Sequence, residues 1–107
     1  MREFAYDHPA VAPSGRVVVK VDNVGSLTHQ LVLVRVPEEL PPLAEQLRSD
    51  TRQAVDTIAN LIDRPAGSNS IIAVDLEPGR YGLVCFLRDA EGLQHHARGM
   101  SSEFRVA

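Results

Sequence analysis

The segment from Cys85 to Met100, CFLRDAEGLQHHARGM, gathers side chains that are suited to binding a soft metal ion. It contains the single cysteine of the chain, two of the four histidines and one of the two methionines. A thiolate, two imidazoles and a weak axial thioether are the donors of a trigonal copper site. The segment supplies a thiolate, an imidazole and a thioether, so the second imidazole must come from another part of the chain.

His29 is the candidate for that second imidazole. It begins a strand predicted over 29–36 (HQLVLVRV) and shares one face of this strand with Leu31. Cys85 lies in another predicted strand, 80–87 (RYGLVCFL), which is also rich in apolar residues. If the two faces are opposed across a β-sandwich, His29 and Cys85 meet at one end of it.

Two adjacent histidines compete for the place in the loop. His95 follows Cys85 after a gap of nine residues and precedes Met100 by a gap of four, and His96 is its neighbour. A loop of this length can bulge outward through residues 89–92 and return either histidine to the cysteine. The spacing alone leaves both histidines open.

Cys85 and its neighbours also fit other roles. A free cysteine in an apolar strand is often a small core residue, and Met100 could fill one end of a sandwich. One thiolate and two imidazoles could bind zinc, although structural zinc sites use more cysteines and no methionine. A hydrolase nucleophile needs an exposed, activated thiolate, whereas Cys85 lies between Val84 and Phe86. The metal site is favoured because histidines and a methionine accompany the cysteine.

Short strands separated by turn residues dominate the rest of the sequence. Four more strands are predicted, over 2–7, 16–22, 70–76 and 102–106. Residues 40–62 break this pattern, because two prolines suit a helix start and apolar residues then recur at helical spacing. These apolar residues are Leu43, Leu47, Ala54, Val55, Ile58, Leu61 and Ile62. We therefore expect an all-β antiparallel sandwich with an inserted α-helical segment around residues 40–63, packed over one face of the strand 29–36.

The composition limits the other possibilities. The 107 residues are the usual length of one domain, taken here as 1–107, and 44% are apolar, which suffices for one core without disulfides. A net charge of −3 argues against nucleic acid as a partner. No stretch approaches the roughly 20 apolar residues of a membrane span. The N-terminal residues lack the basic start and apolar core of a signal peptide.

The sequence resembles the cupredoxin family in a pattern that spans about residues 15–106. The pattern is N-x-G followed by a histidine, then L-x-P-G-x-Y-x-x-x-C-F, G-x-x-H-x-x-x-x-M and F-x-V. It is most similar to small copper-binding-type proteins of bacteria and archaea. The matching residues are Asn23, Gly25, His29, Leu76, Pro78, Gly79, Tyr81, Cys85, Phe86, Gly92, His95, Met100, Phe104 and Val106.

The resemblance implies a cupredoxin-like Greek-key β-sandwich that binds one copper ion. It favours His95 over His96 as the imidazole from the loop. Cys85 would be the thiolate ligand, His29 the buried imidazole and His95 the imidazole nearest the surface, with Met100 as the weak axial ligand. The implied copper ligands are therefore His29, Cys85, His95 and Met100.

Such a site implies a one-electron carrier, rather than an enzyme, that works with a redox partner protein in the periplasm or outside the cell. The partner would dock on an apolar patch formed by Leu93, Ala97 and Met100. The alternative is a cupredoxin-fold module without redox activity, which stores or delivers copper or binds another protein without metal. The long gap between Cys85 and His95 favours this alternative.

Overall fold

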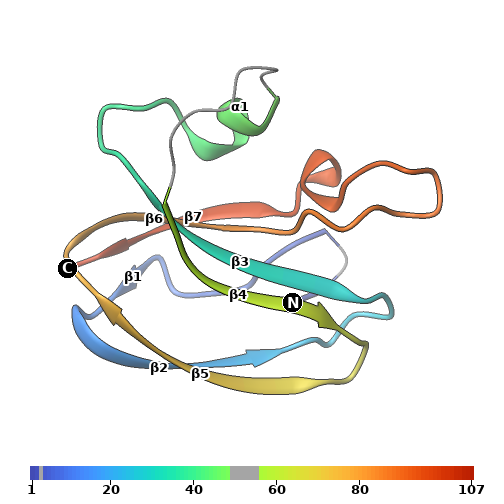
Figure 1. Ribbon diagram of the computed structural model, residues 1–107, viewed down its shortest axis with the longest axis horizontal. Helices are drawn as coiled ribbons and strands as arrows, with labels where there is room; N and C mark the ends of the chain where they lie inside the picture. Colours follow the sequence, from blue (N-terminus) through green and yellow to red (C-terminus); the bar gives the residue numbers. More distant parts are fainter. Residues whose placement is uncertain (3, 49–55) are drawn as a thin grey trace.

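Two β-sheets lie face to face in the computed structural model, which describes residues 1–2, 4–48 and 56–107 (Figure 1). The larger sheet has five strands in the order β1-β7-β6-β3-β4, and the smaller one pairs β2 with β5. The predicted β-sandwich is therefore confirmed. The strands are β1 Val11–Ala12, β2 Gly15–Asp22, β3 His29–Val36, β4 Asp56–Arg64, β5 Asn69–Leu76, β6 Gly79–Val84 and β7 Ser101–Val106.

The edge of the larger sheet differs from the prediction in two ways. The strand predicted over 2–7 is wrong, because Arg2 and Ala5 pair only with each other in a tight turn in which Phe4 has a positive φ of 58°. The edge is instead formed by the two-residue strand β1. This strand pairs parallel with β7, whereas the other strand pairs are antiparallel as expected.

The helix α1, Leu43–Arg48, is much shorter than the segment predicted around residues 40–63. It begins directly after Pro41 and Pro42, where the sequence places its start. The next part of the predicted helix, residues 49–55, lies outside the described residues. No helix in the described part of the chain is long and apolar enough to cross a membrane.

The last part of the predicted helix is a strand. β4 pairs antiparallel with β3, with Leu61 opposite Leu31 and Ala59 opposite Leu33. Leu61 is buried and Ala59 packs on the same core, whereas Ile58, which precedes Ala59, is 39% exposed. This inside–outside alternation has the period of a strand. The helical prediction was wrong because this edge strand has an apolar residue, Ile58, on its outer face. Ile58 and the inward-facing Leu61 are three residues apart, which is also a helical spacing.

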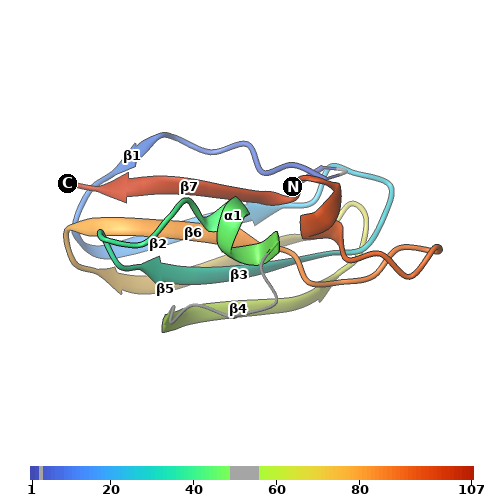
Figure 2. The same ribbon diagram turned by 90° about the horizontal axis from the view of Figure 1, so that it is seen from above.

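β3 is buried on both faces, as its apolar sequence predicts. Leu31 and Leu33 face the smaller sheet and belong to the core between the sheets. Val32 and Val34 face outward and pack with Leu43 of α1. The helix lies over the outer face of the larger sheet (Figure 2). Because both faces of β3 are covered, its position in the sandwich is fixed.

Arg80 ties the chain before α1 to the larger sheet. Its guanidinium pairs with Glu103 on β7, which also accepts a hydrogen bond from the N–H of Leu43 at 3.0 Å. The same guanidinium donates to three carbonyl oxygens, those of Pro37, Leu40 and Pro41. The bond from Leu43 satisfies an N–H group at the start of α1 that the helix itself leaves without a partner, and the bonds from Arg80 hold the chain that leads into the helix.

Gly82 allows α1 to lie this close to the sheet. A Cβ atom at this position would overlap Cδ2 of Leu43. We expect Gly82→Ala to lower the free energy of unfolding by about 1–3 kcal/mol, because it overpacks this contact. Leu43→Ala opens space at the same point, so the loss in the double variant should be smaller than the sum of the single losses. Urea unfolding measures this, and additive losses would contradict the contact.

Candidate metal centre

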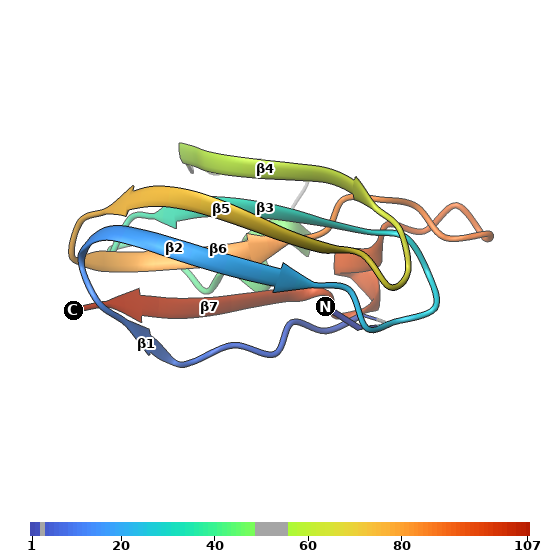
Figure 3. The same cartoon turned by 90° about the horizontal axis from the view of Figure 1, so that it is seen from below.

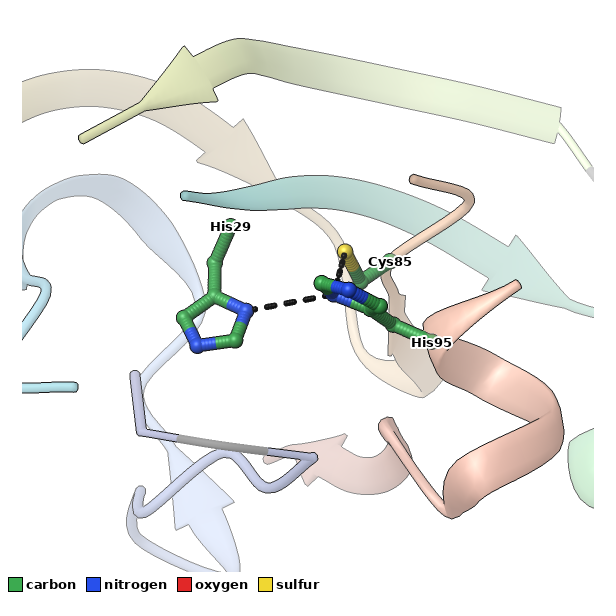
Figure 4. Close-up of side chains that lie close together, drawn as sticks. All are labelled: His29, Cys85 and His95. Carbon is green, nitrogen blue, oxygen red and sulfur yellow. Dashed lines mark hydrogen bonds between the residues drawn. The ribbon is translucent and has the colours of Figure 1, made fainter. Parts of the chain in front are cut away.

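Three buried side chains, one from the start of β3 and two from the segment after β6, meet at one end of the sandwich. The donor atoms of His29, Cys85 and His95 all lie within 4.8 Å of one another. Nδ1 of His95 is 3.3 Å from Nδ1 of His29 and 3.4 Å from Sγ of Cys85 (Figure 4). The exposed fractions of His29, Cys85 and His95 are 0%, 0% and 3%. The cluster is thus shielded from bulk water.

His29 is the first residue of β3 and is positioned by the loop that precedes the strand. The side chain of Asn23 holds this loop, donating to the carbonyl oxygens of Leu27 at 2.9 Å and Arg64 at 2.8 Å. Its own oxygen accepts the N–H of Gly25 at 3.1 Å. Asn23 is almost completely buried, so these bonds replace the water that its amide loses.

Cys85 directly follows β6, and its sulfur is surrounded by protein. The N–H of Gln30 donates to Sγ at 3.3 Å, and the N–H of Cys85 donates to the carbonyl of Met100 at 3.2 Å. Burial raises the pKa of the Cys85 thiol, although backbone N–H groups of Gln30 and Leu87 oppose this. A hydrolase nucleophile needs an accessible thiolate with a lowered pKa, so the geometry disfavours that alternative.

The nine residues between Cys85 and His95 form a closed hairpin. The N–H of His95 donates to the carbonyl of Leu87 at 2.7 Å, and the N–H of His96 donates to the carbonyl of Cys85 at 3.0 Å. These two bonds bring the end of the excursion back to its start. The hairpin projects beyond the ends of the strands (Figure 2). The long gap is therefore compatible with direct contact between Cys85 and His95.

The carboxylate of Asp89 organises the tip of this hairpin. Its Oδ1 accepts the N–H groups of Glu91 at 2.9 Å and Leu93 at 3.0 Å, and its Oδ2 accepts Nε of Arg98 at 2.9 Å. Burial alone would raise the pKa of Asp89, but the hydrogen bonds from Arg98 and the two N–H groups outweigh it and lower the pKa. The ionised carboxylate thus stabilises the closed hairpin.

His96 turns away from the cluster. Its Nε2 lies 2.8 Å from the side-chain oxygen of Gln94, and its ring lies edge-on to Phe86 at 5.4 Å between centroids. The short 3-10 helix η1, His95–Arg98, holds the two histidines on different sides. The structure thus brings His95 to Cys85 and leaves His96 outside the cluster.

Met100 is fully buried beside the cluster. Its N–H donates to the carbonyl of His95 at 3.0 Å, and its carbonyl accepts the N–H of Cys85. Its exposed fraction is 0%, so it is no part of a surface patch with Leu93 and Ala97, and that prediction is wrong. The backbone of Met100 thus links Cys85 to His95 through these two hydrogen bonds.

The N-terminal segment covers the cluster, which the sequence did not indicate. The Phe4 ring stands edge-on to the His95 ring at 5.1 Å between centroids. His95 is thereby buried, but with 3% of its surface exposed it remains the most exposed of the four candidates, as expected. The Tyr6 hydroxyl donates to the carbonyl of Gln30. Burial raises the pKa of Tyr6, and the charge of Cys85 raises it further. No sequence motif indicates that Phe4 or Tyr6 lies near the cluster. The proximity of Gln30 could have been predicted, because it directly follows His29 in the chain.

The donor set fits a single metal ion. Two nitrogens that are about 2.0 Å from one ion, with about 120° between the bonds, lie about 3.5 Å apart. The distance between the Nδ1 atoms of His29 and His95 is 3.3 Å. The distance from Sγ of Cys85 to Nδ1 of His95 is similar at 3.4 Å. Two of the three donor pairs thus have the spacing that one ion requires, and the donors of His29 and Cys85 lie within 4.8 Å of each other.

Comparison with solved structures identifies the fold. The chain resembles a sodium dithionite-reduced auracyanin from the photosynthetic bacterium Roseiflexus castenholzii, with a TM-score of 0.68 and 24% identity. The match covers 99% of this chain and 90% of the auracyanin chain. The sequence matches no protein-family model, and it matches none of the curated proteins. The structural likeness confirms the cupredoxin-like β-sandwich.

Asp89→Ala removes three hydrogen bonds from the hairpin and should let it open more often. We expect the amide hydrogen of His95 to exchange about tenfold faster at neutral pH. Asp75→Ala is the matched control, because its pair with Arg16 is exposed and distant. Hydrogen exchange followed by NMR measures the difference, and equal rates in wild type and Asp89→Ala would contradict the role of the carboxylate.

The comparison of wild type with Asp89→Ala also predicts a dependence on pH. The pKa of Asp89 is lower in the folded state than in the unfolded state. The stabilisation of the hairpin by the Asp89 carboxylate is therefore complete above the unfolded-state pKa of about 3.9. It is lost as the pH falls through the folded-state pKa. The difference in exchange between wild type and Asp89→Ala should disappear in acid.

Proposed function

We propose that this protein binds one copper ion at the cluster and acts as a one-electron carrier. The proposed ligands are His29, Cys85, His95 and Met100. The observation that carries the proposal is the convergence of one thiolate and two imidazole nitrogens in a buried site. A sodium dithionite-reduced auracyanin with the same fold adds support, since that structure is of a reduced protein.

The donor types favour copper over zinc. A structural zinc site takes four strong donors and usually several cysteines. Here a single thiolate is joined by two imidazoles, and the remaining buried candidate is the thioether of Met100. A thioether is a weak, soft donor that suits an axial position on copper.

The chain holds the proposed ligands in place through its backbone. Gln30 donates to the sulfur of Cys85, and the N–H of Cys85 donates to the carbonyl of Met100. The closed hairpin holds His95, and the start of β3 holds His29. Copper held by these residues would gain or lose one electron. A rigid, water-excluding site keeps the ligand geometry similar in both states, which lowers the reorganisation that electron transfer requires.

The proposal includes a redox partner protein and a periplasmic or secreted location. All four ligand candidates are almost wholly buried, so the partner would approach the end of the sandwich rather than touch the metal. A free copper carrier would be unusual in the cytoplasm, which supports an exported location. The proposed role is electron transfer and binding, without catalysis of its own.

A visible spectrum of the purified protein with Cu(II) tests the proposal. We expect an intense blue band from sulfur-to-copper charge transfer, and we expect Cys85→Ser to abolish it. His95→Gln should also abolish the band, whereas His96→Gln should retain it, since His96 lies outside the cluster. The two histidines are adjacent and equal in type, so they are matched controls for each other.

The other outcomes of this experiment separate the alternatives. A protein that takes up no copper would contradict the proposal and leave a metal-free interaction module. Copper uptake without the thiolate band would contradict the carrier function and indicate storage or delivery. Retention of the band in His95→Gln, with loss in His96→Gln, would overturn the assignment of the loop ligand.

Met100→Leu tests the fourth proposed ligand. The axial donor tunes the reduction potential of such a site without building its main geometry. We therefore expect the variant to retain the blue band and to show a shifted reduction potential in a voltammetric titration. Leu47→Met, on α1, is a control outside the cluster. An unchanged potential in Met100→Leu would remove Met100 from the ligand set.

A further inference from the structure

The smaller sheet does not fully cover the inner face of the larger one. Val17 and Val19 on β2 and Ile72 on β5 face the interior, yet they are only partly buried. β2 pairs with β5 alone among the described strands, whereas the facing sheet has five. The N-terminal segment and β1 run along the edge of the larger sheet, next to β7 (Figure 3).

A cavity of about 540 Å³ that is half open to solvent lies here, at the edge where the two sheets face each other. Val19 and Ile72 line it from the smaller sheet, and Leu33 and Phe104 line it from the larger one. Tyr6 lines it from the N-terminal segment. Because both sheets contribute walls, the cavity penetrates the core and is not merely a patch on the surface.

The walls define the chemistry of what can enter. The charged residues at the cavity are exposed: the side chains of Asp7, Lys20 and Asp22 have exposed fractions of 64%, 70% and 48%. They therefore lie at the rim, and the inner walls are apolar. A charged group in the interior would lose its hydration without gaining a partner, which is strongly unfavourable.

We propose that this cavity binds an uncharged apolar small molecule, either a hydrocarbon chain or an aromatic ring system. Small-molecule sites typically have about 300–1,000 Å³ and mostly apolar walls. A folded protein partner cannot reach between the sheets, whereas a slender molecule can. The proposal does not depend on copper, because none of the walls just described is a proposed ligand.

Fluorescence titration with N-phenylnaphthylamine, an uncharged apolar dye, tests the proposal on the full chain. We expect saturable binding and displacement by decanol. Ile72→Trp fills the cavity and should weaken binding at least about tenfold. Ile71→Trp is the matched control, since Ile71 is 71% exposed on the outer face of the same strand. This variant should bind the dye as tightly as wild type does.

Two results of the titration would overturn the proposal. The first is the absence of saturable binding to wild type, which would leave the cavity as a packing defect. The second is equal weakening by Ile72→Trp and Ile71→Trp, which would place the dye elsewhere. Displacement by decanoate as effectively as by decanol would contradict the uncharged ligand class.

A second measurement keeps the test decisive if Ile72→Trp fails to fold. In wild-type protein with labelled methyl groups, decanol should shift the NMR signals of Val17, Val19 and Leu33. The signals of Ile71 and Val34, which lie on the outer faces of the two sheets, should not move. Shifts confined to the outer faces would contradict the site.

Discussion

The antiparallel pairing of β3 with β6 determines where the chemistry of this protein lies. It sets Val32 opposite Val84, so the start of one strand and the end of the other share one end of the sheet. His29 begins β3 and Cys85 directly follows β6. The two side chains therefore converge as neighbours on one sheet rather than across the sandwich. A shift of one residue in this register would turn one of them to the opposite face.

The remaining features bring the third ligand candidate to this point and close the site. The hairpin between Cys85 and His95 folds on itself through backbone hydrogen bonds, so its length does not separate its ends. Phe4 then covers the ring of His95. The result is a preorganised, water-poor cluster, which suits a bound ion that changes charge by one electron. The cavity beside β2 has a different cause. The smaller sheet has only two strands among the described residues, so it leaves part of the inner face of the larger sheet uncovered.

Strand patterning and residue types predicted the sandwich and placed His29 and Cys85 at one end of it. The expected route, two faces opposed across the sandwich, was wrong, because β3 and β6 are neighbours in one sheet. The helical prediction beyond α1 failed because Ile58 and Leu61 fit both a helix and an edge strand, and only pairing with β3 decides between these. The choice between adjacent loop histidines depends on hydrogen bonds within the hairpin, which local sequence does not encode. Cover by Phe4 depends on a turn at a positive φ, a conformation that the sequence does not favour there.

X-ray absorption at the copper edge of the copper-loaded protein is the most direct measurement of the proposed centre. The cluster of His29, Cys85 and His95 predicts one sulfur and two imidazole nitrogens in the inner coordination shell. Their distances from the ion should change little when it is reduced, because the backbone holds the ligand residues. A shell of nitrogen and oxygen alone would contradict a copper site built on Cys85.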